Sequence, residues 1–156
     1  MTPIEFRTRR KVLGLSQEEM GRCVALASPM SDGSDRPAVK QTTIARWEGD
    51  RGLPQWADQT MQGIFDKITI VGLDMEEDLT CIAETLIAQS GPFDAIVLPA
   101  YRSDGEFWAA APHWDGWPVE LWNIAAVRVA DRLMDKHAHT IILDYCRTPG
   151  EDNPKA

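Results

Sequence analysis

Two helices meet in the stretch LGLSQEEM, residues 13–20. Gly14 is the residue type that ends a helix in the left-handed conformation. Ser16 and Glu19, three residues apart, form the capping box that begins the next helix. The stretch therefore predicts one helix that ends at about residue 13 and a second one that begins at residue 17.

The neighbouring sequence extends this helical pattern in both directions. Thr2 and Glu5 form another capping box at the N-terminus. The polar stretch SPMSDGSDRP, residues 28–37, holds several helix-breaking residues and predicts a loop. Beyond it, Ile44 and Trp47 are spaced as the inner face of a further helix. The first half is thus expected to form helices over about 3–13, 17–26, 39–48 and 54–68.

The charge of the chain is divided unevenly between its halves. The 156 residues carry a formal net charge of −8, which argues against a protein that binds nucleic acid over its entire surface. Residues 1–68, however, hold ten Lys/Arg and nine Asp/Glu, whereas residues 69–156 hold six and fifteen. A dense basic cluster lies in the first half, at Arg7, Arg9, Arg10 and Lys11. This cluster suits either a module that binds a polyanion or a solvated helix face.

The composition is typical of an intracellular protein. The three cysteines, Cys23, Cys81 and Cys146, lie far apart and form no C-x-x-C pair, so a disulfide scaffold is not expected. The N-terminus lacks the apolar core of a signal peptide, and no apolar run has the length of a membrane span. We therefore expect a cytoplasmic protein with no membrane partner.

Several residues and short motifs follow one another along the first half of the chain: Arg10, GLSQEEM at 14–20, TIARWE at 43–48, Asp50 and Pro54. Together these features resemble the Cro/phage-repressor (XRE-type) helix-turn-helix family over about residues 3–67. The resemblance implies an all-α DNA-binding domain whose recognition helix enters the major groove.

The resemblance also assigns roles to individual positions. The residues that it places on the DNA face are Lys40, Gln41, Thr42, Ala45 and Arg46. Gln41 suits adenine, because an amide pairs with N6 and N7 together. Gln17 lies in the first turn of the second helix, where the resemblance implies a contact with the phosphate backbone. Arg10 and Glu48 correspond to the ion pair that joins the first helix to the recognition helix.

The predicted loop at 28–37 departs from the family. Its members join the second helix to the recognition helix by a tight turn, which is lengthened here by roughly ten residues. Three roles are open for this segment: it can fold away, contact the DNA backbone through Arg36, or bind another molecule.

The second half mixes helices with strands. Its predicted elements are a helix over 74–88, a strand over 95–101, a short hairpin strand over 106–110, a helix over 118–136 and a strand over 139–145. Strand, helix, strand suggests two parallel strands joined by a right-handed crossover. We expect an α+β chain with a helix-turn-helix domain at 1–68, a small α/β dimerisation domain at 69–150 and a flexible tail at 151–156.

The small predicted sheet favours a homodimer. A sheet of so few strands cannot cover both of its faces, so it needs its own helices, a second copy or both. Operator half-sites lie about 34 Å apart, which also favours two copies joined by the second half. We assign to the dimer contact Trp108, Trp122, Val129 and Ile141. The tryptophan cluster, which includes Trp114 and Trp117, suits a core or dimer interface first and a ligand groove second.

Patterns for catalysis or metal binding are weak. Cys146 with His137 and His139 lacks the spacing of known zinc sites. Asp104 and Glu106 are better explained as a solvated hairpin tip than as an acid–base pair. The sequence has no glycine-rich phosphate loop. We therefore expect no cofactor, no metal ion and no enzyme activity.

Two stretches of the second half, VLPAY at 97–101 and LWNIAAVRVADRL at 121–133, follow the predicted order of elements. This arrangement resembles anti-CRISPR-associated repressors of phages, which implies a phage or prophage autoregulator. The sequence thus predicts a homodimeric transcriptional repressor that binds a palindromic operator in double-stranded DNA. The alternative is an antitoxin-like or host-factor-binding interaction module, with a protein partner on the second half.

Overall fold

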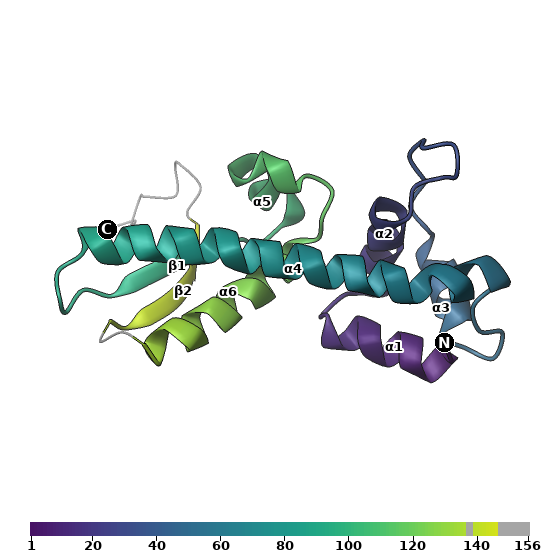
Figure 1. Ribbon diagram of the computed structural model, residues 1–156, viewed down its shortest axis with the longest axis horizontal. Coiled ribbons are helices and arrows are strands. Elements are labelled where there is room, and N and C mark those ends of the chain that lie inside the picture. Colours follow the sequence, from purple (N-terminus) through teal and green to yellow (C-terminus); the bar gives the residue numbers. More distant parts are fainter. Residues whose placement is uncertain (137–138, 147–156) are drawn as a thin grey trace, which may run out of the picture.

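The computed structural model describes residues 1–136 and 139–146 (Figure 1). Within these residues the chain forms six α-helices, one 3₁₀ helix and a two-stranded sheet. The elements are α1 (Pro3–Val12), α2 (Gln17–Ala27), α3 (Gln41–Trp47), α4 (Gln55–Gln89), β1 (Ile96–Ala100), α5 (Asp104–Ala110), η1 (Pro112–Trp114), α6 (Val119–Met134) and β2 (Ile141–Tyr145). The expected mixture of helix and strand is confirmed. The predicted tail at 151–156 lies outside the described residues.

The predicted starts of α1 and α2 are confirmed. The Thr2 side chain accepts a hydrogen bond from the Glu5 N–H, and Ser16 accepts one from the Glu19 N–H, with both capping boxes complete. Gly14 has a φ of +72°, a conformation that glycine adopts without steric cost. A Cβ at this position would lie 2.4 Å from the Ile124 Cδ1 atom, so the end of α1 also packs closely on α6.

The long helix α4 differs from the prediction. It runs for 35 residues without a break, about 52 Å at 1.5 Å per residue. Ile64, Ile68, Val71, Met75 and Leu79 are all buried, so the helical spacing of apolar residues continues across the position where we predicted two separate helices. The expected division between residues 68 and 69 falls inside α4. No helix of the described residues combines the length and apolarity needed to cross a membrane.

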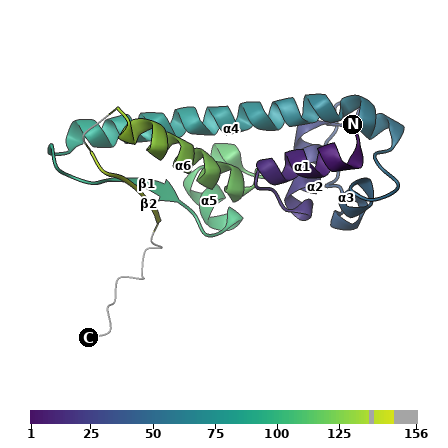
Figure 2. The same cartoon turned by 90° about the horizontal axis from the view of Figure 1, so that it is seen from below.

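Helix α4 supports the other elements along its length (Figures 1 and 2). α1, α2 and α3 lie beside its N-terminal part, whereas α6 and the sheet lie beside its C-terminal part. In the first group, Phe6 packs edge-on against Trp47 and Phe65, with ring centroids 5.9 and 5.8 Å apart. Aromatic contacts therefore join α1, α3 and α4.

The sheet confirms the expected parallel pair of strands. β1 and β2 align with Ile96 opposite Ile141, and α6 lies between them in sequence. Ile96, Leu98 and Ile141 are buried on the face that α4 and α6 cover. The other face is exposed, with Val97 and Ile142 adjacent across the pair and 44 % and 43 % exposed.

The predicted hairpin strand at 106–110 is wrong, because residues 104–110 form helix α5. The Ser103 hydroxyl caps this helix by accepting a hydrogen bond from the Glu106 N–H, and Phe107 is fully buried. Asp104 is not part of a hairpin tip. Its carboxylate accepts a hydrogen bond from the Val119 N–H at 2.8 Å and pairs with Arg22 of α2 at 2.8 Å.

Candidate nucleic-acid interface

Helix α3 presents an exposed face at one end of the molecule (Figure 1). The five positions predicted to face DNA all have exposed side chains, at Lys40, Gln41, Thr42, Ala45 and Arg46. Ile44 and Trp47 point inward and are buried. The structure thus gathers the predicted base-reading positions on one solvent-facing side of a seven-residue helix.

An aromatic cluster holds the inner side of α3 in place. The Trp47 ring packs edge-on against Phe6 at 5.9 Å and against Trp56 at 5.7 Å between centroids. Trp56 lies in the first turn of α4 and remains 39 % exposed. Because rings of this size are stiff and well packed, α3 is held firmly against α1 and α4.

The predicted ion pair between Arg10 and Glu48 is present. Arg10 Nε lies 2.5 Å from Glu48 Oε1, and Nη2 lies 3.2 Å from Oε2. The same guanidinium donates from Nη1 to the Leu15 carbonyl. Both side chains are more than nine-tenths buried, so this pair fixes α1 to the C-terminal end of α3.

The environment of Glu48 favours its charged form. Burial raises the pKa of this carboxyl, but hydrogen bonds from Arg10 and Gln17, together with the Arg10 charge, outweigh burial and hold the pKa below its ordinary value. The carboxylate is therefore ionised wherever the protein is near neutral pH.

Gln17 belongs to the same hydrogen-bond network. Its Nε2 atom donates to Glu48 Oε2 at 3.0 Å, and the side chain is half-buried at the start of α2. An amide group has two N–H donors, so one donor serves Glu48 and one is left for an outside acceptor. The predicted phosphate contact thus needs the second N–H, while the first orients the side chain.

The connection between α2 and α3, residues 28–40, contacts the helices through Arg36 and Val39, while residues 29–35 are exposed and project away from the helices (Figure 1). Arg36 donates from Nε to the Ser28 carbonyl at 2.7 Å, and its guanidinium lies 4.6 Å from the centre of the Trp56 ring. The Val39 N–H donates to the Gly21 carbonyl at 3.1 Å. These contacts give Arg36 a role in holding the loop, which the sequence did not reveal.

Three of the four residues assigned to the dimer contact are buried within their own chain. Trp122, Val129 and Ile141 are 2 %, 0 % and 4 % exposed, and the Trp122 indole donates to the Pro99 carbonyl at 2.9 Å. Trp108 is half-buried and donates to the Trp117 carbonyl at 2.8 Å. Trp122 and Val129 have the spacing of inward-facing positions of α6, which α4 and the sheet cover here, and Ile141 lies on the covered face of the sheet. The assignment of Trp122, Val129 and Ile141 to a dimer surface is therefore corrected, whereas that of Trp108 stays a prediction.

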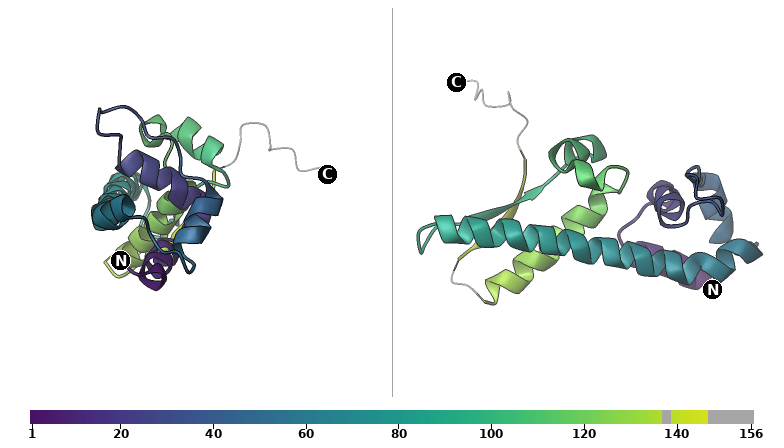
Figure 3. Two further views of the ribbon diagram at one scale, coloured as in Figure 1. Left: turned by 90° about the vertical axis from the view of Figure 1, so that its right-hand side faces the viewer. Right: turned by 45° about the horizontal axis from the view of Figure 1, so that its top comes forward.

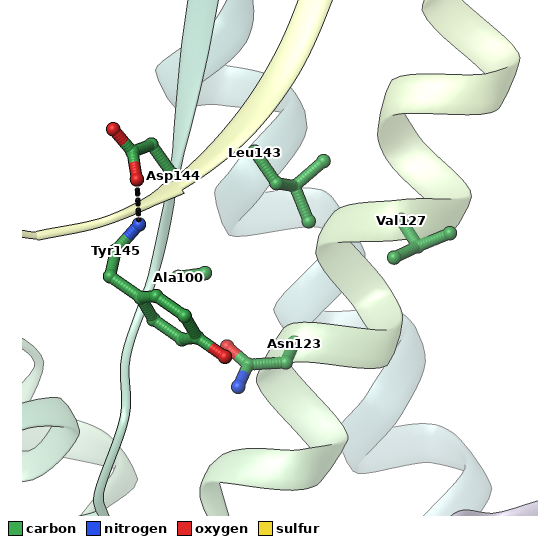
Figure 4. Close-up of a pocket in the computed structure, with 6 residues that line it drawn as sticks. All are labelled: Ala100, Asn123, Val127, Leu143, Asp144 and Tyr145. Atoms are coloured by element: carbon green, nitrogen blue, oxygen red, sulfur yellow. Dashed lines mark hydrogen bonds between the residues drawn. The ribbon is translucent and has the colours of Figure 1, made fainter.

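A cavity of about 340 Å³ lies between α6 and the C-terminal ends of the strands (Figure 4). This is where α/β sheets often bind ligands, and two of the polar side chains that line it, Asn123 and Asp144, have partners within the chain. The Asn123 amide bonds both the N–H and the carbonyl of Tyr101, at 3.1 and 2.9 Å. The Asp144 carboxylate accepts a hydrogen bond from the Tyr145 N–H at 2.8 Å.

The cysteines and histidines of the described residues lie apart from one another in the fold, and His113 pairs with Asp78 at 2.9 Å. Burial raises the pKa of the Cys23 thiol to about 12, which makes it unreactive. His139 bonds the Asp94 carbonyl at 3.1 Å, and His137 lies outside the described residues. Across residues 1–136 and 139–146, no three His, Cys, Asp or Glu side chains gather as metal ligands would.

Sequence reasoning missed two residues that shape this end of the molecule. Trp56 supports Arg36 and Trp47, and nothing in its local sequence indicates that contact. Gly21 lies inside α2, where a glycine often marks a close backbone approach. A Cβ there would lie 1.9 Å from the Val39 carbonyl oxygen.

Comparisons of the chain with protein-family models, curated proteins and solved structures found no match.

Proposed function

We propose that this protein is a sequence-specific DNA-binding regulator of the helix-turn-helix type, which represses a phage or prophage operon as a homodimer. The observation that carries the proposal is the exposed face of α3. Gln41, Thr42, Ala45 and Arg46 are free to reach a ligand, while the Arg10–Glu48 pair holds the helix that bears them.

The side chains of this face suit the major groove. Gln41 offers an amide that pairs with the N7 and N6 atoms of adenine, and Thr42 and Ala45 offer methyl groups to thymine. Lys40 and Arg46 lie at the two ends of α3, where they suit phosphates on either side of the groove. In this docking α3 reads the bases, and the start of α2 contributes Gln17 to the backbone.

The charge distribution limits non-specific affinity. Residues 1–68 have nearly balanced charges, and residues 69–156 are strongly acidic. Non-specific binding to DNA comes from cations that replace condensed counterions. The ten Lys/Arg of residues 1–68 are nearly matched by nine Asp/Glu, so binding depends on a small number of specific contacts that a homodimer makes twice.

The test is a selection of duplexes from a random DNA pool with the full chain, followed by titration of the enriched sequence at several salt concentrations. We expect an enriched palindrome whose affinity falls as salt rises, because phosphate contacts release counterions. A pool that stays random, with no salt-sensitive binding to any duplex, would refute the proposal.

Gln41→Ala is expected to relax the preference at one base pair of each half-site. The lost bidentate contact costs about 1–3 kcal/mol against the preferred base, which titration of matched and mismatched duplexes measures. Gln89→Ala, at an exposed glutamine near the far end of α4, serves as the control and keeps full affinity. An equal loss on all sequences would identify Gln41 as a backbone contact instead.

A further inference from the structure

On one side of the molecule α1 and α6 both run along α4 (Figure 2), and apolar side chains of α1 and α4 are exposed there. Ile4 and Val12 of α1 are 68 % and 69 % exposed, and Leu73 of α4 is 57 % exposed. Apolar side chains scattered singly are ordinary on a protein surface, but a contiguous group indicates an interface.

Three adjoining hollows make this surface continuous. The first, of about 250 Å³, shares Thr8 and Arg9 with the second, of about 200 Å³. The second shares Val12, Leu13 and Thr69 with a third, of about 220 Å³, that reaches α6. We call this surface the α1 groove and define it by Ile4, Thr8, Arg9, Val12, Thr69 and Leu73.

We propose that the α1 groove is the contact between two copies of this chain. Glu5 and Arg9 are one helical turn apart and line the same hollow with Ile4 and Thr8. When two α1 helices pack antiparallel about a two-fold axis near their middle, each Glu5 comes opposite Arg9 of the other copy. Ile4 then comes near Val12 of the other copy. The surface is thus self-complementary in charge and apolar contact, as a two-fold interface requires.

The position of α3 agrees with this pairing, an argument that rests on the proposed function. The hollows are lined by residues of α1, α4 and α6, and no residue of α3 lines them; α3 lies on the opposite side of the helical layer from the long course of α4 (Figure 3). Two copies joined through the α1 groove therefore leave both α3 faces open to DNA.

The spacing of the operator half-sites also favours the α1 groove, rather than the sheet, as the contact between two copies. α1 lies beside the end of α4 that carries α3, whereas β1 and β2 lie towards the opposite end of a helix about 52 Å long (Figure 1). Half-sites one helical turn apart need recognition helices about 34 Å apart. The uncovered sheet face, with Val97 and Ile142, is also less exposed than Ile4 and Val12.

The experiment measures the mass of the full chain in solution without DNA, by analytical ultracentrifugation over a wide concentration range. We expect a dimer for the unaltered chain. Val12→Glu should weaken self-association by about tenfold or more, since it buries a charge in the contact. Ile142→Glu, on the uncovered sheet face, is the matched control and should leave the dimer intact.

A charge variant tests the pairing of Glu5 with Arg9. Arg9→Glu sets acidic groups against Glu5 of the other copy and should weaken the dimer several-fold, whereas Arg7→Glu, at an exposed position outside the hollows, should not. Circular dichroism melting confirms that each variant is folded. Any of three results would overturn the inference: a monomeric unaltered chain, a folded Val12→Glu variant that remains dimeric, or an Ile142→Glu variant that becomes monomeric.

This experiment separates the inference from the proposed function. The mass measurement contains no DNA, so a monomer there overturns the α1 groove contact and leaves sequence-specific DNA binding to be judged by the duplex selection. A dimer that selects no duplex overturns the proposed function and leaves the contact standing.

Discussion

Arg10→Ala is expected to lower the free energy of unfolding by about 3–5 kcal/mol, the usual cost of removing one partner of a buried ion pair. The substitution leaves the Glu48 carboxylate buried with Gln17 as its remaining hydrogen-bond donor. It also leaves the Leu15 carbonyl without the Arg10 donor. Urea unfolding followed by circular dichroism measures the loss.

The control is Lys11→Ala, which removes an exposed lysine from the same helix. Surface substitutions of this kind usually change stability by less than about 0.5 kcal/mol. A second variant, Arg10→Met with Glu48→Leu, replaces the pair by apolar side chains and should be more stable than Arg10→Ala alone. Equal stability of Arg10→Ala and the unaltered chain would show that the ion pair does not hold α1 to α3.

The same pair makes stability depend on pH. The pKa of Glu48 is lowered in the folded protein from an ordinary value of 4.5, so its stabilising effect is complete above pH 4.5 and is lost as the pH falls through the lower folded pKa. Unfolding measured between neutral and acidic pH should show this loss in the unaltered chain. Glu48→Gln should remove that part of the pH dependence.

Local signals in the sequence predicted the first part of the fold well. The capping boxes at Thr2 and Ser16 and the left-handed Gly14 are properties of a few neighbouring residues, and all three are present. The strands β1 and β2 were recognisable because each is a short apolar run of strand length. Such features need no knowledge of distant contacts, which explains why they could be predicted.

The errors arise where local signals compete with packing. Ser103, Asp104 and Gly105 have the composition of a turn, but Ser103 begins a helix because burial of Phe107 stabilises that alternative. Similarly, the change in charge composition near residue 68 suggested a boundary, while the apolar spacing continued through it. In both cases the pattern of buried residues was the more reliable signal.

The candidate site was predictable only in part. Spacing identifies Trp122 and Val129 as inward-facing, but it does not say whether the chain itself or a second copy covers them. Ile4 and Val12, by contrast, are exposed, and their exposure follows from where α4 and α6 pack rather than from their spacing in the sequence. Surfaces between copies therefore depend on the tertiary arrangement, which a single sequence does not contain.

The connection between α2 and α3 leads to the second large effect. Gly21 lies within α2, and the backbone at Val39 crosses it so closely that an added Cβ would lie 1.9 Å from the Val39 carbonyl oxygen and 3.0 Å from its carbon. Val39 directly precedes Lys40, the N-cap of α3. A shift of this backbone therefore moves the start of the helix proposed to read DNA.

Gly21→Ala is expected to destabilise the protein by about 1–3 kcal/mol, the usual cost of overpacking. Without a clash, alanine in a helix interior would stabilise by about 1 kcal/mol relative to glycine, so the sign of the change is diagnostic. The duplex titration should show a further loss, because residual folded protein presents α3 out of position. Urea unfolding and titration of the selected palindrome measure the two effects.

Gly63→Ala provides the matched control, because this glycine is exposed within α4 and an added Cβ would meet no atom within 4 Å. It should gain about 0.5–1 kcal/mol and keep its affinity for DNA. If Gly21→Ala were as stable as Gly63→Ala, the close approach of Val39 would be refuted. If it were destabilised but bound DNA normally when folded, then the position of α3 would not depend on this crossing, and the anchoring of α3 would rest on Trp47 and the Arg10–Glu48 pair alone.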